Sequence, residues 1–156
     1  MAYDRYFVYQ SPSPCGRSNV RPPNDESHKG GLNTKLHLAV DSFGMPVRAI
    51  ITDGTVADCS KTGELINGID ADYLLAGRGY DTDGVIEKVR EAKMETVIPP
   101  KRNRKIQREY NHAIYENWHQ IENTFLKLKR WQGIATRYAK KASSYMESVQ
   151  IACLIL

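Results

Sequence analysis

Apolar positions along the chain predict five strands. Polar and apolar residues alternate in TKLHLAV, whereas YLLA is a short apolar run typical of a buried strand. Turn residues at Asp41–Gly44 predict that the second and third strands form a hairpin. The five predicted strands are Tyr3–Gln10, Thr34–Val40, Pro46–Thr52, Tyr73–Ala76 and Thr96–Ile98.

Apolar residues at helical spacing predict four helices, at Ser60–Ile66, Gly84–Lys93, His112–Trp131 and from Ser143 to the C-terminus. Asp58 or Ser60 is the expected N-cap of the first helix, and Asp83 is that of the second. The longest helix has an apolar stripe formed by Ile114, Ile121, Phe125 and Leu128.

This order of elements predicts an α/β fold, a mixed sheet flanked by helices that matches the ribonuclease-H-like architecture. The Ser, Pro, Asn and Gly content of residues 11–28 is typical of a loop or a disordered stretch. We therefore expect a separate N-terminal segment at residues 1–28 and one domain at residues 29–156.

Composition favours a soluble globular domain. The chain has 156 residues, of which 41% are hydrophobic and 26% charged. No apolar run could span a bilayer and no signal peptide follows Met1, so we expect a cytoplasmic protein with no membrane partner. Three widely spaced cysteines favour neither a disulfide framework nor a zinc site.

Positive charge is concentrated late in the chain. Residues 101–141 hold 11 Lys and Arg against 3 Asp and Glu, whereas residues 1–100 hold 11 against 14. Such a cluster is expected where phosphates are neutralised, although a solvated face or a charged disordered loop is the alternative. The candidate DNA-backbone contacts are Lys101, Arg102, Arg104, Lys105, Arg108, Lys127 and Arg130.

Four blocks of sequence resemble bacterial insertion-sequence transposases of the DDE type. They are Lys29–His37 (KGGLNTKLH), Thr55–Cys59 (TVADC), Val97–Arg104 (VIPPKRNR) and Lys129–Tyr138 (KRWQGIATRY). The resemblance runs from about Lys29 to Leu156, and we expect a C-terminally truncated copy. Between the blocks, the family signature of Tyr, two residues, Arg, three residues, Glu, six residues and Lys fits Tyr115, Glu122 and Lys129.

The resemblance implies metal-dependent cleavage and joining of DNA strands. Mg²⁺ or Mn²⁺ would be held by two aspartates and a glutamate, because hard ions of this kind need carboxylate oxygens. It implies Glu122 as a metal ligand and Tyr115 and Lys129 as accessory site residues, with Lys129 near a phosphate. The expected partner is double-stranded DNA, at the element ends and at the target, and a homo-oligomer is a further expectation. The alternatives are an ordinary surface glutamate and a solvated lysine.

The sequence departs from the family at two of these positions. The family block resembles Leu-Ala-Asp-Lys-Gly-Tyr-Asp, whereas residues 75–81 read LAGRGYD, so Gly77 replaces the second aspartate. Asp81 is a poor substitute, and we expect it to serve a turn or a cap. Trp118 stands where the signature has Arg, and an indole cannot make a guanidinium's bidentate phosphate contact. We therefore expect weak metal binding and a catalytically defective copy.

The first aspartate of the family is expected on the opening strand. Asp4 is near the right spacing, but its neighbours do not resemble the family block. Back-translation of Tyr3–Asn19, read one nucleotide later, permits Ile-Asp and then Lys-Val-His-Arg-His-Ala-Ala-Gly-Ala, which resembles that block. Our hypothesis is that the N-terminal segment is a frameshifted reading.

Other candidate side chains carry less weight. His37 is expected to be packed or at the surface, and His112 and His119 lack the further ligands of a metal site. Asp53 and Asp58 flank a glycine turn and are expected to cap a helix. Three interpretations remain open: a catalytic domain, a non-catalytic DNA-binding remnant that interferes with an intact transposase, and a pseudogene product without a role.

Overall fold

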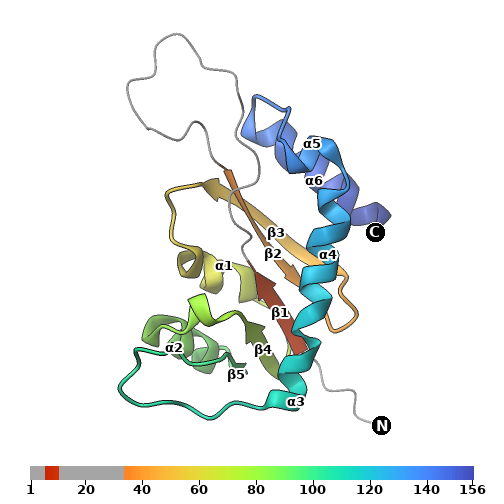
Figure 1. Cartoon of the computed structure of the whole chain (residues 1–156). Coiled ribbons are helices and arrows are strands. Elements are labelled where there is room, and N and C mark those ends of the chain that lie inside the picture. The colour runs from red at the N-terminus through yellow and green to blue at the C-terminus, as the bar shows by residue number, and fades with distance from the viewer. Residues whose placement is uncertain (1–5, 11–33) are drawn as a thin grey trace.

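The computed structural model describes residues 6–10 and 34–156, with side chains from residue 34 onward. Its centre is a five-stranded sheet in the order β3-β2-β1-β4-β5 (Figure 1). Strand β1 pairs antiparallel with β2 and parallel with β4, so the sheet is mixed. The strands are β1 Tyr6–Gln10, β2 Thr34–Val40, β3 Pro46–Asp53, β4 Tyr73–Ala76 and β5 Glu95–Val97.

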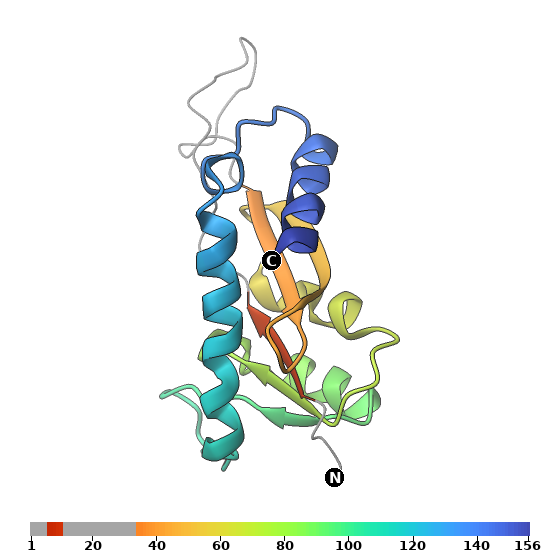
Figure 2. The same cartoon turned by 90° about the vertical axis from the view of Figure 1, so that its right-hand side faces the viewer.

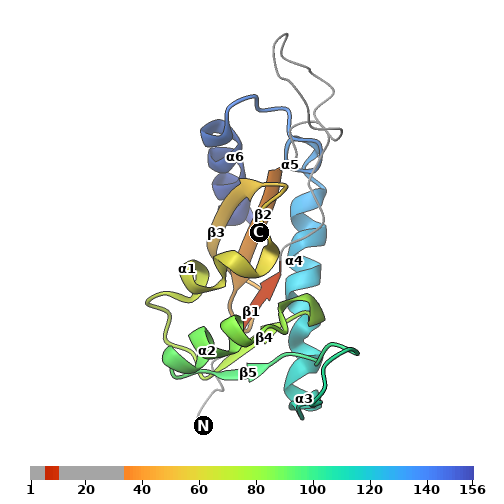
Figure 3. The ribbon, with the colours of Figure 1, turned by 90° about the vertical axis from the view of Figure 1, so that its left-hand side faces the viewer.

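Helices cover both faces of the sheet. One face carries α1 (Thr62–Ile66) and α2 (Asp83–Glu91), with a 3₁₀ turn at Asp58–Lys61 before α1 (Figure 3). The other face carries the long helical segment and α6 (Figure 2). The elements of this second layer are α3 His112–Tyr115, the 3₁₀ turn Glu116–Trp118, α4 His119–Lys129, α5 Gln132–Ala135 and α6 Ala142–Ile155. The predicted mixed sheet flanked by helices is thereby confirmed.

The sheet separates two apolar cores because side chains alternate across it. Leu36, Leu38 and Val40 of β2 pack with buried residues of α4 and α6, among them Ile121 and Val149. Buried residues on the opposite face pack against α1 and α2, and they include Ala39, Leu65, Leu74, Val85 and Val89. Each helix layer is thus held by its own set of apolar contacts.

The predicted helix beginnings need correction. Thr82, and not Asp83, is the N-cap of α2, since its Oγ1 accepts a hydrogen bond from the amide of Val85 at 3.3 Å. The 3₁₀ turn before α1 begins after Ala57 without a side-chain cap, and Asp58 instead pairs with Lys35 at 2.9 Å. The predicted helix at His112–Trp131 is interrupted by the 3₁₀ turn and ends at Lys129. The loop predicted at residues 11–28 lies outside the described residues.

Helix α4 is fixed across the sheet by its apolar stripe and by one polar contact. Ile121, Phe125 and Leu128 are buried as the stripe predicts. Thr124 is also buried, and its hydroxyl donates to the carbonyl oxygen of Gly44 at 2.6 Å. That glycine lies in the β2–β3 turn with a φ of +80°, so the hairpin turn and the helix approach closely.

Among the described residues, no helix is both long enough and apolar enough to span a membrane.

Candidate functional site at the carboxyl end of strand β4

Two parallel strands end side by side beneath α4. Tyr9 of β1 lies opposite Ala76 of β4, so Gly77 begins at the same edge at which β1 ends. Helix α4 packs beside β1 at this edge. Carboxyl ends of parallel strands are common places for a site. Yet β1 contains neither Asp nor Glu, and Asp4 lies outside the described residues.

Gly77 faces the indole of Trp118. Its φ of −68° and ψ of 161° are extended, so the backbone would accept any residue. A Cβ added at Gly77 would lie 3.4 Å from Cζ2 and 3.5 Å from Cη2 of Trp118, and apart from its chain neighbours no other described residue would lie within 4 Å. The aromatic ring therefore borders the position of the missing aspartate.

The same edge of the indole also contacts Glu122. Nε1 of Trp118 donates a hydrogen bond to Oε1 of Glu122 at 3.2 Å, one turn further along the helical segment. The ring also stacks on Tyr115, with centroids 6.0 Å apart and planes 8° apart. Trp118 is half-buried and packs against both cores, so it joins the two layers at the end of the sheet.

The Tyr115 hydroxyl has both a negatively and a positively charged neighbour. Burial, together with the neighbouring Tyr110 and the negative charge of Glu122, raises the pKa of the Tyr115 hydroxyl, and Arg78 opposes this rise. Tyr110 makes an edge contact with the Tyr115 ring at 5.5 Å. The hydroxyl of Tyr115 is therefore protonated at neutral pH, and the residues predicted at 115 and 122 do lie together.

The lysine of the signature lies further away. Lys129 is two helical turns beyond Glu122, on the same strip of the helix surface, and is exposed. Lys127 and Arg130 are exposed as well, and within the described part of the chain none of the three forms an ion pair. These side chains are free to contact phosphates.

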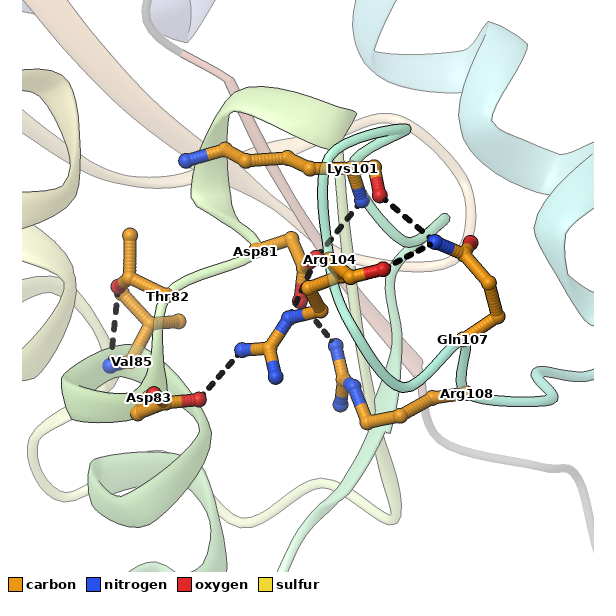
Figure 4. A network of polar contacts seen from close by, with 8 residues as sticks. All are labelled: Asp81, Thr82, Asp83, Val85, Lys101, Arg104, Gln107 and Arg108. Atoms are coloured by element: carbon orange, nitrogen blue, oxygen red, sulfur yellow. Dashed lines mark hydrogen bonds and ion pairs between the residues drawn. The ribbon is translucent and has the colours of Figure 1, made fainter.

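Asp81 is the centre of a buried ion-pair network. Its carboxylate, fully shielded from solvent, accepts hydrogen bonds from the amide of Lys101 at 2.7 Å, from Nε of Arg104 at 2.9 Å and from Arg108 (Figure 4). Arg104 also pairs with Asp83. Burial alone would raise the pKa of Asp81, but these donors outweigh it and hold the pKa below its ordinary value. The expectation of a simple turn or cap was therefore incomplete.

This network divides the predicted DNA-binding residues into two groups. Arg104 and Arg108 are engaged with Asp81, so their charge is largely neutralised within the chain. Arg102 and Lys105 are exposed, and Lys101 is half-buried; their side chains form no ion pair among the described residues. Gln107 donates to the carbonyl oxygens of Lys101 and Arg104, each at 3.0 Å, which orders the segment.

The residues present do not fit a two-ion metal site. In residues 34–156, no three His, Cys, Asp or Glu side chains form a group that could hold a metal ion. Glu122 has an indole as its polar neighbour, Gly77 offers no side-chain oxygen, and Asp81 is occupied by two arginines. A divalent ion such as Mg²⁺ needs several oxygen ligands, and one exposed carboxylate supplies too few.

The histidines have structural surroundings. His37 is fully buried, and its Nε2 forms a hydrogen bond with Oγ1 of Thr52 at 2.7 Å. Burial is the main reason that the pKa of its imidazole is lowered. His112 packs against Tyr110, while Nδ1 of His119 contacts the carbonyl oxygen of Glu116 at 2.6 Å. That they are not metal ligands stays a prediction.

The fold is that of ribonuclease-H-like DNA transposases. The chain resembles the piggyBac transposase in its synaptic complex with hairpin DNA, with a TM-score of 0.53 and 11% identity. This similarity covers 96% of the chain and 45% of that transposase, so the chain spans less than half of its length.

Residues 13–156 match the family model described as transposase DDE domain. The transposase named for insertion sequence element IS6501 of Brucella ovis is 32% identical over 129 residues, which are 80% of this chain and 98% of that relative. The one named for IS402 of Burkholderia cepacia is 24% identical over 154 residues, covering 90% of this chain and 69% of that relative. The chain belongs to the transposase DDE domain family, whose functional class is DNA transposition and whose members generally depend on divalent metal ions. The match begins within residues 1–28, and the domain boundary at residue 28 stays a prediction.

Two features of the site were missed in the sequence. The Asp81 network joins residues more than 20 positions apart, and no local pattern indicates it. The contact of the Trp118 ring with both Gly77 and Glu122 was also missed. Its signal was present, because both departures from the family pattern occur at positions that turn out to be in contact.

Proposed function

We propose that this chain is a transposase domain that binds duplex DNA but does not cut it. The observation that carries the proposal is the site at the end of β4. There, Glu122 is the one described carboxylate at a family ligand position, and the indole of Trp118 lies against Gly77. Two-metal strand cleavage depends on ions that stabilise both the attacking and the leaving oxygen. Without their ligands, that stabilisation is lost.

DNA binding is supported by positive charge on two segments that forms no ion pair within the described part of the chain. Arg102 and Lys105 lie on the segment that Asp81 anchors, and Lys127, Lys129 and Arg130 lie at the end of α4. Lysine and arginine contacts to phosphates release counterions and give affinity without sequence specificity. The piggyBac transposase, which has a similar fold, was solved in a complex with hairpin DNA, and this supports duplex DNA as the partner.

Fluorescence anisotropy of a labelled duplex tests this proposal. Each neutralised phosphate contributes about −0.9 to the slope of log affinity against log salt, so five contacts lower affinity roughly 10²- to 10³-fold between about 50 and 200 mM salt. We expect a steep linear dependence of this kind, in the absence of any divalent ion. Affinity that does not change with salt, or no binding at the lowest salt, contradicts the proposal.

A further inference from the structure

We infer that Trp118 blocks the metal position of this domain, so that the site is filled as well as short of a ligand. This inference rests on the proposed function, since both take Gly77 and Glu122 as family ligand positions. One edge of the indole contacts both positions. That edge lies 3.4 Å from the Cβ position of residue 77, and its N–H lies 3.2 Å from the Glu122 carboxylate.

At Gly77, the space beside the indole limits which side chain can be accommodated, and the backbone conformation does not. The extended backbone accepts an aspartate, and a Cβ alone would make ordinary contact with the indole. The carboxyl group of an aspartate extends beyond that Cβ, beside the six-membered ring. That carboxyl group and the Glu122 carboxylate would lie along the same edge of the ring, which therefore borders the space that an ion held by both would need.

At Glu122, the indole occupies one of the two carboxylate oxygens that could bind a metal ion. The N–H donates to Oε1, which is one of the two oxygens that could bind an ion. An indole has a donor and no acceptor, so it can satisfy a carboxylate but cannot bind a cation through its nitrogen. Trp118 thus provides Glu122 with a neutral partner in place of a metal ion.

The ring is also held through its face. Tyr115 stacks on it almost in parallel, with centroids 6.0 Å apart, and both apolar cores pack against it. A side chain constrained by these contacts does not move aside without loss of packing. Restoring the aspartate alone is therefore insufficient, because the space and the Glu122 oxygen remain occupied.

Mn²⁺ binding by four proteins tests this inference: the wild type, Gly77→Asp, Trp118→Arg and the double variant. The loss of the free-ion electron paramagnetic resonance signal reports binding in each. We expect the double variant to bind Mn²⁺ at least tenfold more tightly than Gly77→Asp, and Trp118→Arg alone to bind no better than the wild type. A double variant that binds no more tightly than Gly77→Asp overturns the inference.

Two further proteins make the result specific. Gly77→Asp with Trp131→Arg removes an exposed tryptophan elsewhere, and it should behave as Gly77→Asp alone. If Trp118→Arg does not fold, as judged by circular dichroism, Gly77→Asp with Trp118→Phe supplies the same comparison. Phenylalanine keeps the stacking with Tyr115, lacks the N–H and is smaller, so Mn²⁺ affinity should again exceed that of Gly77→Asp.

Mn²⁺ binding to the site with Gly77, Trp118 and Glu122 unchanged can be followed by the fluorescence of Trp118. The chain has two tryptophans, so Trp131→Phe leaves Trp118 as the only one. Mn²⁺ bound at Glu122 would quench the adjacent indole, and we expect no saturable quenching. Saturable quenching that disappears in Glu122→Gln overturns the inference. Failure of the proposed function would appear separately, in the metal-free DNA titration.

Discussion

Nε1 of Trp118 lies 3.2 Å from Oε1 of Glu122, and Cζ2, on the same edge of the indole, lies 3.4 Å from the Cβ position of Gly77. The departures from the family pattern at residues 77 and 118 therefore meet at one point in space. The glycine removes a carboxylate, and the tryptophan occupies the adjacent volume. A site that has lost one ligand could regain function by one substitution, whereas this site requires at least two.

Replacing Trp118 by alanine should destabilise the domain. Removal of a large buried aromatic side chain typically costs about 3 to 5 kcal/mol, and we expect about 2 to 3 kcal/mol because Trp118 is only half-buried. Urea unfolding followed by circular dichroism measures the change. The matched control is Trp131→Ala, whose side chain is 41% exposed and should cost less than about 1 kcal/mol. Equal effects of both substitutions would contradict the packing described for Trp118.

Asp81 should stabilise the folded state in a pH-dependent manner. Its pKa is held below the ordinary value of 3.8, so its contribution is complete above about pH 4 and is lost as pH falls through the lower folded-state pKa. Asp81→Asn should lower the free energy of unfolding at pH 7 by about 2 to 3 kcal/mol, slightly less than is usual for a broken buried pair, since both arginines are partly exposed.

The measurement is urea unfolding of wild type and Asp81→Asn from neutral pH down to pH 3. The difference between the two should narrow on acidification. Asp83→Asn is the control, because the Asp83 side chain is 92% exposed and its pairing with Arg104 should matter little. A constant difference at all pH values would show that the carboxylate charge is not the source.

The cationic residues of the 101–108 segment should form two groups, one that binds DNA and one that stabilises the fold. Neutralising Arg102 and Lys105 together as glutamines should reduce the salt slope of DNA binding by about 2, without loss of stability. Arg104→Gln and Arg108→Gln should instead lower the unfolding free energy, since these side chains pair with Asp81. The charge-matched control is Arg90→Gln with Lys93→Gln at the end of α2. If the salt slope of DNA binding is unchanged in the Arg102 and Lys105 double variant, these two residues do not contact DNA.

Gly44→Ala should disturb the attachment of α4. The glycine has a φ of +80°, and an added Cβ would lie 3.2 Å from Oγ1 of Thr124. The left-handed backbone alone costs roughly 1 to 2 kcal/mol for a residue with a side chain, and we expect a loss of about that size in thermal or urea unfolding. Gly79→Ala, where an added Cβ meets none of the described residues within 4 Å, should be nearly neutral. Equal effects at both glycines would contradict the model of a close turn.

Local patterns predicted most of the fold. The alternation in TKLHLAV and the run YLLA predicted β2 and β4 with the bounds found in the structure. The polar residues Thr34 and His37 of β2 are buried, which its alternation does not indicate, whereas the run YLLA is buried as its pattern requires. The stripe through Ile121, Phe125 and Leu128 was confirmed for the same reason. Boundaries were less accurate, since Thr82 and Asp83 are both good caps and only the fold decides between them.

The arrangement of the site could not be predicted from local patterns. Asp81 and Arg108 are far apart in sequence, and a basic run looks alike whether it contacts phosphate or a buried carboxylate. The spacing of Tyr115 and Glu122 did predict one surface, because helical geometry is local. Contact with Gly77 depended on how α4 crosses the sheet, which the sequence pattern does not specify.

The most direct measurement of the central claim is nicking of supercoiled plasmid DNA by the wild-type chain in Mg²⁺ and in Mn²⁺, beside Glu122→Gln. The account predicts that the wild type binds the plasmid and that neither protein nicks it above background. Metal-dependent nicking by the wild type that is abolished in Glu122→Gln would contradict the account.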